Sequence, residues 1–277
     1  MNTITLNDGH RIPAIGFGTY EAKDQEVYEA VREALRAGYR HIDTAALYQN
    51  EEAVGKAIKD SGIPREEIFV TTKLWNDAHD YGKAKVAFQE SLDRLGLDYI
   101  DLYLIHWPNP LALRDQWQSA NRETWRALEE LVETGKVRSI GVSNFMVHHL
   151  EALLESARIV PAVNQIRLAP GVYQKEVVDF CRDKNILLTA WAPLGRGELF
   201  QHPVMLELSQ KYGVTVAQLS LAWSIQEGFV PLPKSVTFSR IRENIDLPDI
   251  LLSEEDKLKL REITVENRAL DPDTVTF

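Results

Sequence analysis

Apolar residues follow two alternating spacings along the chain. In residues 24–37, Val27, Val31 and Leu35 recur at helical spacing, whereas residues 68–73 form a short run rich in β-branched side chains. The same pattern predicts strands at residues 15–18, 40–43, 68–73, 99–105, 139–142, 162–165, 186–191 and 229–232. It predicts helices at residues 24–37, 51–60, 83–95, 122–134, 147–156, 174–183, 203–212, 216–226, 239–245 and 253–263.

This regular alternation predicts the α/β class, because parallel strands need helical crossovers. Eight units of roughly 31 residues match a (β/α)8 TIM barrel, and an open doubly wound sheet is the competing topology. Residues 3–6 and 11–15 flank the turn Asn7-Asp8-Gly9-His10 and predict a β-hairpin that caps one end of the barrel. The chain finishes with extra C-terminal helices. No linker is found, so we expect residues 1–277 to form a single barrel domain, with a loosely ordered tail after Glu266.

The chain has 277 residues and a formal net charge of −10, which argues against a nucleic-acid partner and against an anionic membrane surface. An anionic ligand must therefore find a local basic pocket. Cys181 is the only cysteine, so no disulfide within the chain is expected. The N-terminal residues become polar too early for a secretory segment, and no apolar run reaches membrane-spanning length. These features predict a cytoplasmic protein, which we expect to be a monomer.

The ends of the predicted strands carry candidate chemistry. Asp43, Lys73 and His106 each lie at such an end, about one βα unit apart, where barrel enzymes place reactive groups. Tyr48 follows in the loop after Asp43. A phenol with a pKa of about 10 is a weak acid at neutral pH, but a nearby ammonium stabilises the phenolate and lowers that pKa. We therefore expect Asp43 to hold Lys73 charged beside Tyr48, while His106 hydrogen-bonds a substrate oxygen.

Three segments together resemble the signatures of the aldo-keto reductase family. They are residues 38–55, residues 138–145 with the sequence Arg-Ser-Ile-Gly-Val-Ser-Asn-Phe, and residues 232–244, which contain Lys-Ser-Val-Thr-Phe-Ser-Arg. The chain is most similar to the bacterial group of 2,5-diketo-D-gluconate and methylglyoxal reductases. The resemblance implies reduction of aldehydes or ketones to alcohols by hydride transfer from NADPH. It implies α-keto aldehydes, keto sugars such as 2,5-diketo-gluconate, or aromatic aldehydes as small carbonyl substrates.

The resemblance also implies a role for each candidate residue. Tyr48 is implied as the general acid, with Lys73 and Asp43 tuning it and His106 orienting the carbonyl. Trp191 is implied to stack on the nicotinamide ring. The substrate-contacting residues are expected to be Tyr20, Tyr48, Trp75, His106 and Trp107.

The cofactor site is predicted away from any glycine-rich turn. Residues 16–21 and 195–200 both fail the Gly-x-Gly-x-x-Gly pattern at the third glycine, so a Rossmann phosphate turn is not predicted. Lys234, Ser235 and Arg240 follow the last strand, where barrels often bind phosphate, and their charges suit the ribose 2′-phosphate of NADPH. The resemblance implies further cofactor contacts by Gly18, Thr19, Asp43, Ser143, Asn144, Gln165, Trp191, Pro193, Leu194, Gly195, Val236, Glu243 and Asn244.

Other interpretations stay open at this point. Asp43 could cap a helix, and Lys234 and Arg240 could form ordinary surface ion pairs. A non-catalytic dinucleotide-sensing or partner-binding protein could use the same barrel, and so could a metal-dependent hydrolase or lyase. No metal site is predicted, because the histidines lack paired ligand spacing and His148 and His149 are expected to face different directions.

Overall fold

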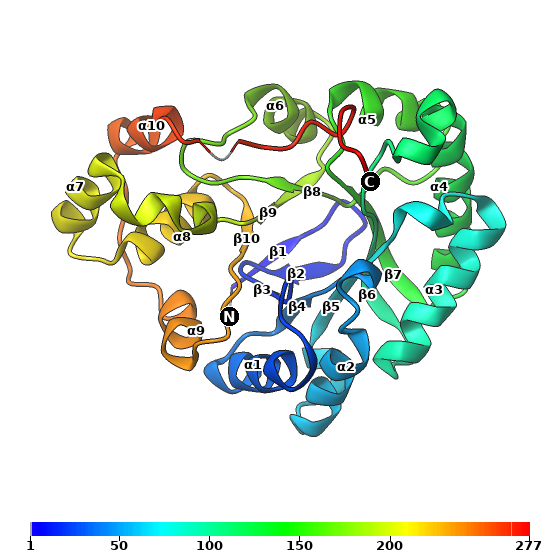
Figure 1. Cartoon of the computed structure of the whole chain (residues 1–277), viewed down its shortest axis with the longest axis horizontal. Helices are drawn as coiled ribbons and strands as arrows, with labels where there is room; N and C mark the ends of the chain where they lie inside the picture. The colour runs from blue at the N-terminus through cyan, green and yellow to red at the C-terminus, as the bar shows by residue number, and fades with distance from the viewer. Residues whose placement is uncertain (1, 267) are drawn as a thin grey trace.

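The computed structural model describes residues 2–266 and 268–277, and eight parallel strands form its centre (Figure 1). The sheet order runs from β3 to β10, so each strand lies beside its neighbour in the sequence. This sequential order confirms the TIM barrel and excludes the doubly wound sheet, in which the strand order reverses. The strands are β3 (Phe17–Gly18), β4 (His41–Asp43), β5 (Phe69–Leu74), β6 (Ile100–Ile105), β7 (Val137–Ser143), β8 (Val163–Arg167), β9 (Leu187–Trp191) and β10 (Val230–Leu232).

The barrel closes where β3 meets β10. The Gly16 N–H donates to the Pro231 carbonyl, and the Gly18 N–H donates to the Pro233 carbonyl, each over 3.0 Å. Glycine permits this approach at Gly18, because a Cβ there would lie 3.1 Å from the Leu232 carbonyl oxygen. The seam thus joins the first and last strands of the sheet by backbone contacts.

A β-hairpin covers the end of the barrel at which the strands begin. Its strands β1 (Thr3–Thr5) and β2 (Arg11–Pro13) pair antiparallel, which confirms the predicted cap. Ile12 is fully buried and belongs to the same apolar cluster as Phe69 and Leu102, from the strands above it. The opposite end, where the strands finish, is left for the functional side chains.

Helices surround the barrel on all sides (Figure 1). Val27, Val31 and Ala34 of the first helix are fully buried, and Gly38 ends that helix with a left-handed φ of 108°. The helices are α1 (Asp24–Ala37), α2 (Glu51–Asp60), α3 (Tyr81–Leu95), α4 (Trp117–Glu133), α5 (Val147–Leu154), α6 (Lys175–Asp183), α7 (Pro203–Tyr212), α8 (Val216–Gln226), α9 (Phe238–Ile245) and α10 (Glu254–Glu262). Both α7 and α10 are additional to one helix per strand, so the predicted extra helices are present in the C-terminal part of the chain.

Two predictions about the chain near the barrel mouth are wrong. Helix α4 begins at Trp117 rather than at residue 122, after a 3₁₀ segment, η4 (Leu111–Gln116). The Trp117 ring lies 4.7 Å from the His149 ring, a contact between distant residues that helical periodicity does not reveal. The tail after Glu266 is packed rather than loose: its described residues run along the rim of the barrel mouth (Figure 1, red), where Asp273 bonds His149 and Asn109.

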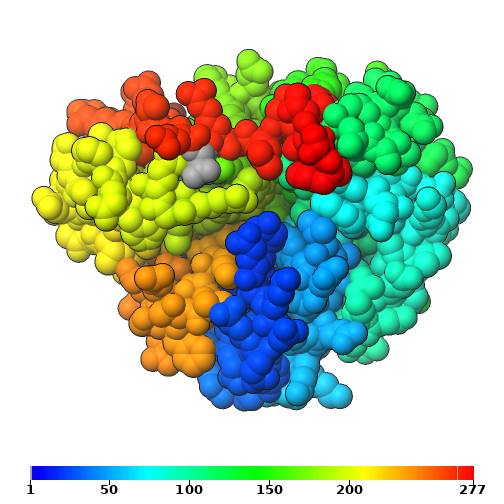
Figure 2. Space-filling model, in the orientation of Figure 1, coloured from blue at the N-terminus to red at the C-terminus, as the bar shows by residue number. Residues whose placement is uncertain are grey.

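The face on which the strands end is hollowed. Figure 2 shows the hollow between the C-terminal segment, in red, and the blue N-terminal part of the chain. Across residues 2–266 and 268–277, no helix has both the length and the apolar character needed to cross a membrane.

Candidate active site

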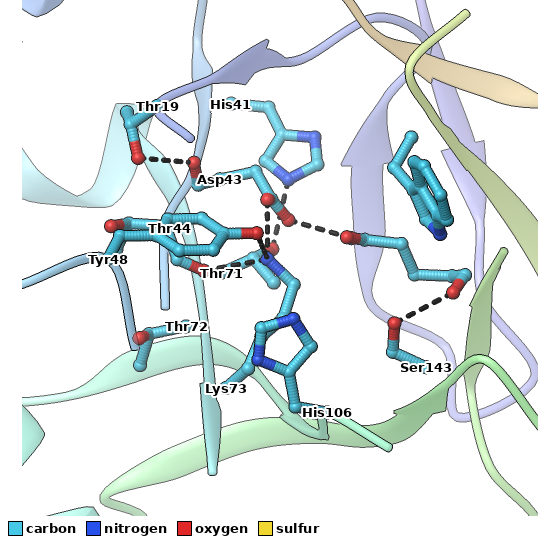
Figure 3. A network of polar contacts seen from close by, with 12 residues as sticks. Thr19, His41, Asp43, Thr44, Tyr48, Thr71, Thr72, Lys73, His106 and Ser143 are labelled. Carbon is cyan, nitrogen blue, oxygen red and sulfur yellow. Dashed lines mark hydrogen bonds and ion pairs between the residues drawn. The ribbon is translucent and has the colours of Figure 1, made fainter. Parts of the chain in front are cut away.

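A buried ammonium lies at the centre of the site. Asp43 ends β4 and Lys73 lies on β5, the neighbouring strand, so the barrel brings the two side chains together. Lys73 Nζ is 2.6 Å from Asp43 Oδ1, 2.8 Å from the Thr44 carbonyl oxygen and 3.4 Å from the Tyr48 hydroxyl (Figure 3). The Lys73 side chain has 0% exposure, so its three N–H donors all act within the protein.

The Tyr48 hydroxyl reaches Lys73 because its loop is fixed by hydrogen bonds. Tyr48 ends a 3₁₀ turn, η1 (Ala46–Tyr48). The buried Asn50 side chain accepts from the Thr44 hydroxyl over 2.7 Å and donates to the Thr19 and Ala22 carbonyl oxygens over 3.0 and 2.9 Å. Asn50 was not predicted as a site residue, because its place just before α2 indicates only the start of a helix.

The other oxygen of Asp43 is held by a second chain of contacts. Gln165 Nε2 donates to Asp43 Oδ2 over 2.7 Å, and the Ser143 hydroxyl donates to the Gln165 carbonyl oxygen over 2.8 Å. The Thr19 hydroxyl donates to the Asp43 carbonyl oxygen over 3.0 Å. The carboxylate is therefore fixed between an ammonium and an amide.

His106 follows β6 and completes the cluster. Its ring lies 5.9 Å from the Tyr48 ring, and Asn144 Nδ2 donates to its carbonyl oxygen over 3.0 Å. In Figure 3 the rings of Tyr48 and His106 lie on either side of the Lys73 ammonium. Burial holds the pKa of His106 well below its ordinary value, and the positive charge of Lys73 lowers it further. The imidazole is therefore neutral at physiological pH.

The titration of Lys73 and Tyr48 reflects burial as well as pairing. Burial lowers the pKa of Lys73, but Asp43 and Tyr48 outweigh it and leave the pKa raised. Burial raises the pKa of Tyr48, and the opposing effect of Lys73 does not reverse the shift. The expected lowering of the Tyr48 pKa is thus wrong in its net direction, because desolvation of the phenolate is the larger effect. Tyr48 therefore keeps its proton at neutral pH.

Aromatic rings surround the polar cluster. The Trp75 ring lies 5.2 Å from the His106 ring, and the Tyr20 ring lies 5.1 Å from the Tyr48 ring. Phe277 stacks on Trp75 at a ring distance of 5.9 Å, and it meets the buried Trp107 edge-on at 5.1 Å. Phe277 was not predicted, because nothing in a polar tail indicates that its last side chain reaches the barrel mouth.

A second group of predicted residues gathers where β7, β8 and β9 end. The Trp191 indole N–H donates to Asn144 Oδ1 over 2.9 Å, and Asn144 Nδ2 donates to the Ser143 hydroxyl over 3.1 Å. Asn144 has a left-handed φ of 61°, which asparagine tolerates better than most residues. Together with Gln165, this arrangement offers an aromatic face beside amide and hydroxyl groups.

The predicted phosphate ligands lie on the β10 side. Lys234 Nζ is 3.5 Å from the Glu21 carbonyl oxygen, and the Ser235 hydroxyl accepts from the Thr237 N–H over 3.1 Å. Arg240 is exposed on α9 and has no ion pair in the part of the chain that the structure describes. Of the other predicted contacts, Gly18 pairs with Asp43 in the β3–β4 ladder and donates to Pro233, and the remainder follow β9 or β10: Pro193, Leu194, Gly195, Val236, Glu243 and Asn244.

His148 and His149 converge on one carboxylate, which corrects the expectation that they face different directions. Each Nε2 lies 3.0 Å from an oxygen of Asp273, and the two rings are 3.9 Å apart. The Met146 N–H donates to His149 Nδ1 over 3.1 Å, so His149 Nε2 carries the proton and donates to Asp273. This assignment protonates the nitrogen that a metal ion would have to bind.

Comparison with known proteins places these features in context. Residues 14–264 match the model of the aldo/keto reductase family. The chain is 45% identical to a glyoxal reductase of Bacillus subtilis, over 100% of this chain and 98% of that protein. Its structure resembles an aldo-keto reductase from a Medee basin deep-sea metagenome library, with a TM-score of 0.91, 44% identity and coverage of 99% and 100% of the two chains. It also resembles a Bombyx mori aldo-keto reductase in complex with NADP, with a TM-score of 0.86, 40% identity and coverage of 94% and 92%.

Proposed function

The chain belongs to the aldo/keto reductase family and is an NADPH-dependent enzyme that reduces carbonyl compounds, and from that premise we propose that Tyr48 protonates the carbonyl oxygen. One observation carries this proposal: the buried Lys73 ammonium contacts both the Asp43 carboxylate, at 2.6 Å, and the Tyr48 hydroxyl, at 3.4 Å. A phenol beside a permanently charged ammonium can give up its proton and leave a phenolate that is already paired.

The four side chains divide the chemistry between them. Tyr48 donates the proton, and Lys73 stabilises the phenolate that remains. Asp43 keeps Lys73 charged and fixed, since an unpaired ammonium would lose its proton on burial. His106 is neutral and donates a hydrogen bond to the carbonyl oxygen, which directs that oxygen toward the Tyr48 hydroxyl.

The residues on the other side of the mouth fit NADPH. Trp191 offers a flat face for the nicotinamide, while Ser143, Asn144 and Gln165 offer partners for its amide group. Lys234, Ser235 and Arg240 supply two cations and a hydroxyl for the ribose 2′-phosphate, and Arg240 is exposed and available. When bound there, NADPH supplies a hydride to the carbonyl carbon.

We propose small aldehydes and ketones as the substrates, including α-keto aldehydes, keto sugars such as 2,5-diketo-gluconate, and aromatic aldehydes. The glyoxal reductase of Bacillus subtilis, 45% identical, supports the α-keto aldehydes. The Trp75 ring beside His106, with the Phe277 and Trp107 rings packed next to it, supports substrates with a flat substituent.

Replacement of Tyr48 tests the proposal directly. Tyr48→Phe removes the hydroxyl and keeps the ring, so we expect a loss of roughly 10²- to 10⁴-fold in kcat with methylglyoxal, while NADPH still quenches tryptophan fluorescence. Tyr28→Phe is the matched control, because its hydroxyl bonds Asp60 on the outer surface. Full activity of the Tyr48 variant would refute the assignment of the acid.

A further inference from the structure

The C-terminal segment, residues 268–277, is fastened to the barrel at a point away from the reacting groups. Asp273 accepts hydrogen bonds from His149 Nε2 at 3.0 Å and from Asn109 Nδ2 at 2.7 Å, and His148 Nε2 lies 3.0 Å from its other oxygen. His149 is fully buried, and the Trp117 ring packs against it at 4.7 Å. We call this arrangement of Asp273 with His148, His149 and Asn109 the Asp273 clasp.

Directed hydrogen bonds from His149 and Asn109 hold the Asp273 carboxylate in place. The Met146 N–H fixes the protonation of His149, so the ring can only donate to Asp273. Asp273 Oδ1 therefore accepts from both His149 and Asn109, while Oδ2 lies 3.0 Å from His148 Nε2. A charged acceptor with several donors is among the stronger polar contacts available at a protein surface.

Beyond the clasp, the segment runs toward the mouth. The Leu111 N–H donates to the Phe277 carbonyl oxygen over 3.4 Å, and Arg114 donates to the Val275 carbonyl oxygen. Hydrogen bonds from η4 therefore hold the backbone of residues 275–277 in place. Phe277 then lies between Trp75 and Trp107, at ring distances of 5.9 and 5.1 Å. Phe277 as a residue is still 45% exposed, which leaves part of its surface open to a ligand.

We propose that Asp273 is a positioning residue that determines substrate preference, because its clasp holds Phe277 as one wall of the pocket for the substituent of the carbonyl compound. The inference rests on the proposed function, since it takes the carbonyl to lie between Tyr48 and His106. The Trp75 ring contacts both His106 and Phe277, so a flat substituent on the carbonyl carbon lies beside the Phe277 ring. Aromatic aldehydes gain this contact, whereas methylglyoxal is too small to use it.

Steady-state kinetics of Asp273→Ala and Phe277→Ala with NADPH test the proposal on two probe substrates. With 4-nitrobenzaldehyde we expect KM to rise about tenfold in both variants and kcat to stay within about twofold, because an aromatic contact contributes roughly 0.5–1.5 kcal/mol. With methylglyoxal we expect both constants to stay within about twofold. Leu270→Ala is the matched control, because Leu270 lies in the same segment with its side chain exposed.

The double variant separates positioning from a general loss of structure. If Asp273 acts through Phe277, Asp273→Ala combined with Phe277→Ala raises KM no further than Phe277→Ala alone. Additive effects, equal changes with both aldehydes, or an unchanged KM in Asp273→Ala would each overturn the proposal. Failure of the proposed function is recognised separately, as full activity in Tyr48→Phe, which leaves the KM comparison intact.

Discussion

Replacing Lys73 by methionine removes one ammonium and keeps a side chain of similar length. In the wild type, Lys73 Nζ contacts Asp43 Oδ1 at 2.6 Å, the Thr44 carbonyl oxygen at 2.8 Å and the Tyr48 hydroxyl at 3.4 Å, with no exposure to solvent. Lys73→Met leaves the Asp43 carboxylate buried at 3% exposure with Gln165 as its remaining side-chain donor. Removing one partner of a buried ion pair costs about 3–5 kcal/mol.

A double variant separates the cost of an unpaired buried charge from the cost of changed side-chain packing. Asp43→Asn combined with Lys73→Met leaves no unpaired charge, so we expect part of the lost stability to return. Urea unfolding followed by circular dichroism gives the free energy of each variant at pH 7. A single variant within about 1 kcal/mol of wild type would refute the argument, and so would a double variant less stable than the single. In the single variant we also expect kcat to fall roughly 10²- to 10⁴-fold, because the Tyr48 phenolate loses its counter-charge.

Two further predictions concern pH and cofactor choice. Burial lowers the pKa of His79 to about 4, below its unfolded value of about 6.5, so stability falls as the pH drops between those values. We expect His79→Leu to reduce the difference in unfolding free energy between pH 7 and pH 5 by about 2 kcal/mol; an unchanged difference in urea titrations would contradict this. Arg240→Ala should weaken NADPH about 10- to 100-fold and NADH much less, measured as Kd by fluorescence, because a hydrogen bond to a charged group contributes about 1.5–3 kcal/mol. Arg242→Ala is its control, since Arg242 pairs with Glu33 on α1, and equal losses for both dinucleotides would count against a 2′-phosphate contact.

Local spacing and chemistry were enough to predict much of the fold. Helices α1, α2, α7 and α8 have the predicted bounds. Clear apolar periodicity defines α1 and α2, and a left-handed glycine ends α1 and α7. The convergence of Asp43, Lys73 and His106 followed from the barrel alone, because parallel strands deliver their ends to one face.

Features that depend on distant contacts escaped prediction. Phe277 meets Trp75 and Trp107 across most of the chain length, and no periodic pattern records such a contact. The direction of the Tyr48 pKa shift depends on how far the site excludes water, which residue types do not reveal. His148 and His149 are adjacent on α5, yet their rings turn toward Asp273.

The closure of the barrel between β3 and β10 has a consequence for stability when the cofactor binds. Gly16 and Gly18 donate to the carbonyl groups of Pro231 and Pro233, which as prolines have no N–H to return. The proposed contacts of the dinucleotide lie on both sides of this join, at Thr19 on one edge and at Lys234 and Ser235 on the other. A dinucleotide bound to both strands would link them across the seam. Because it binds only the closed barrel, it would stabilise the fold as well as supply the hydride.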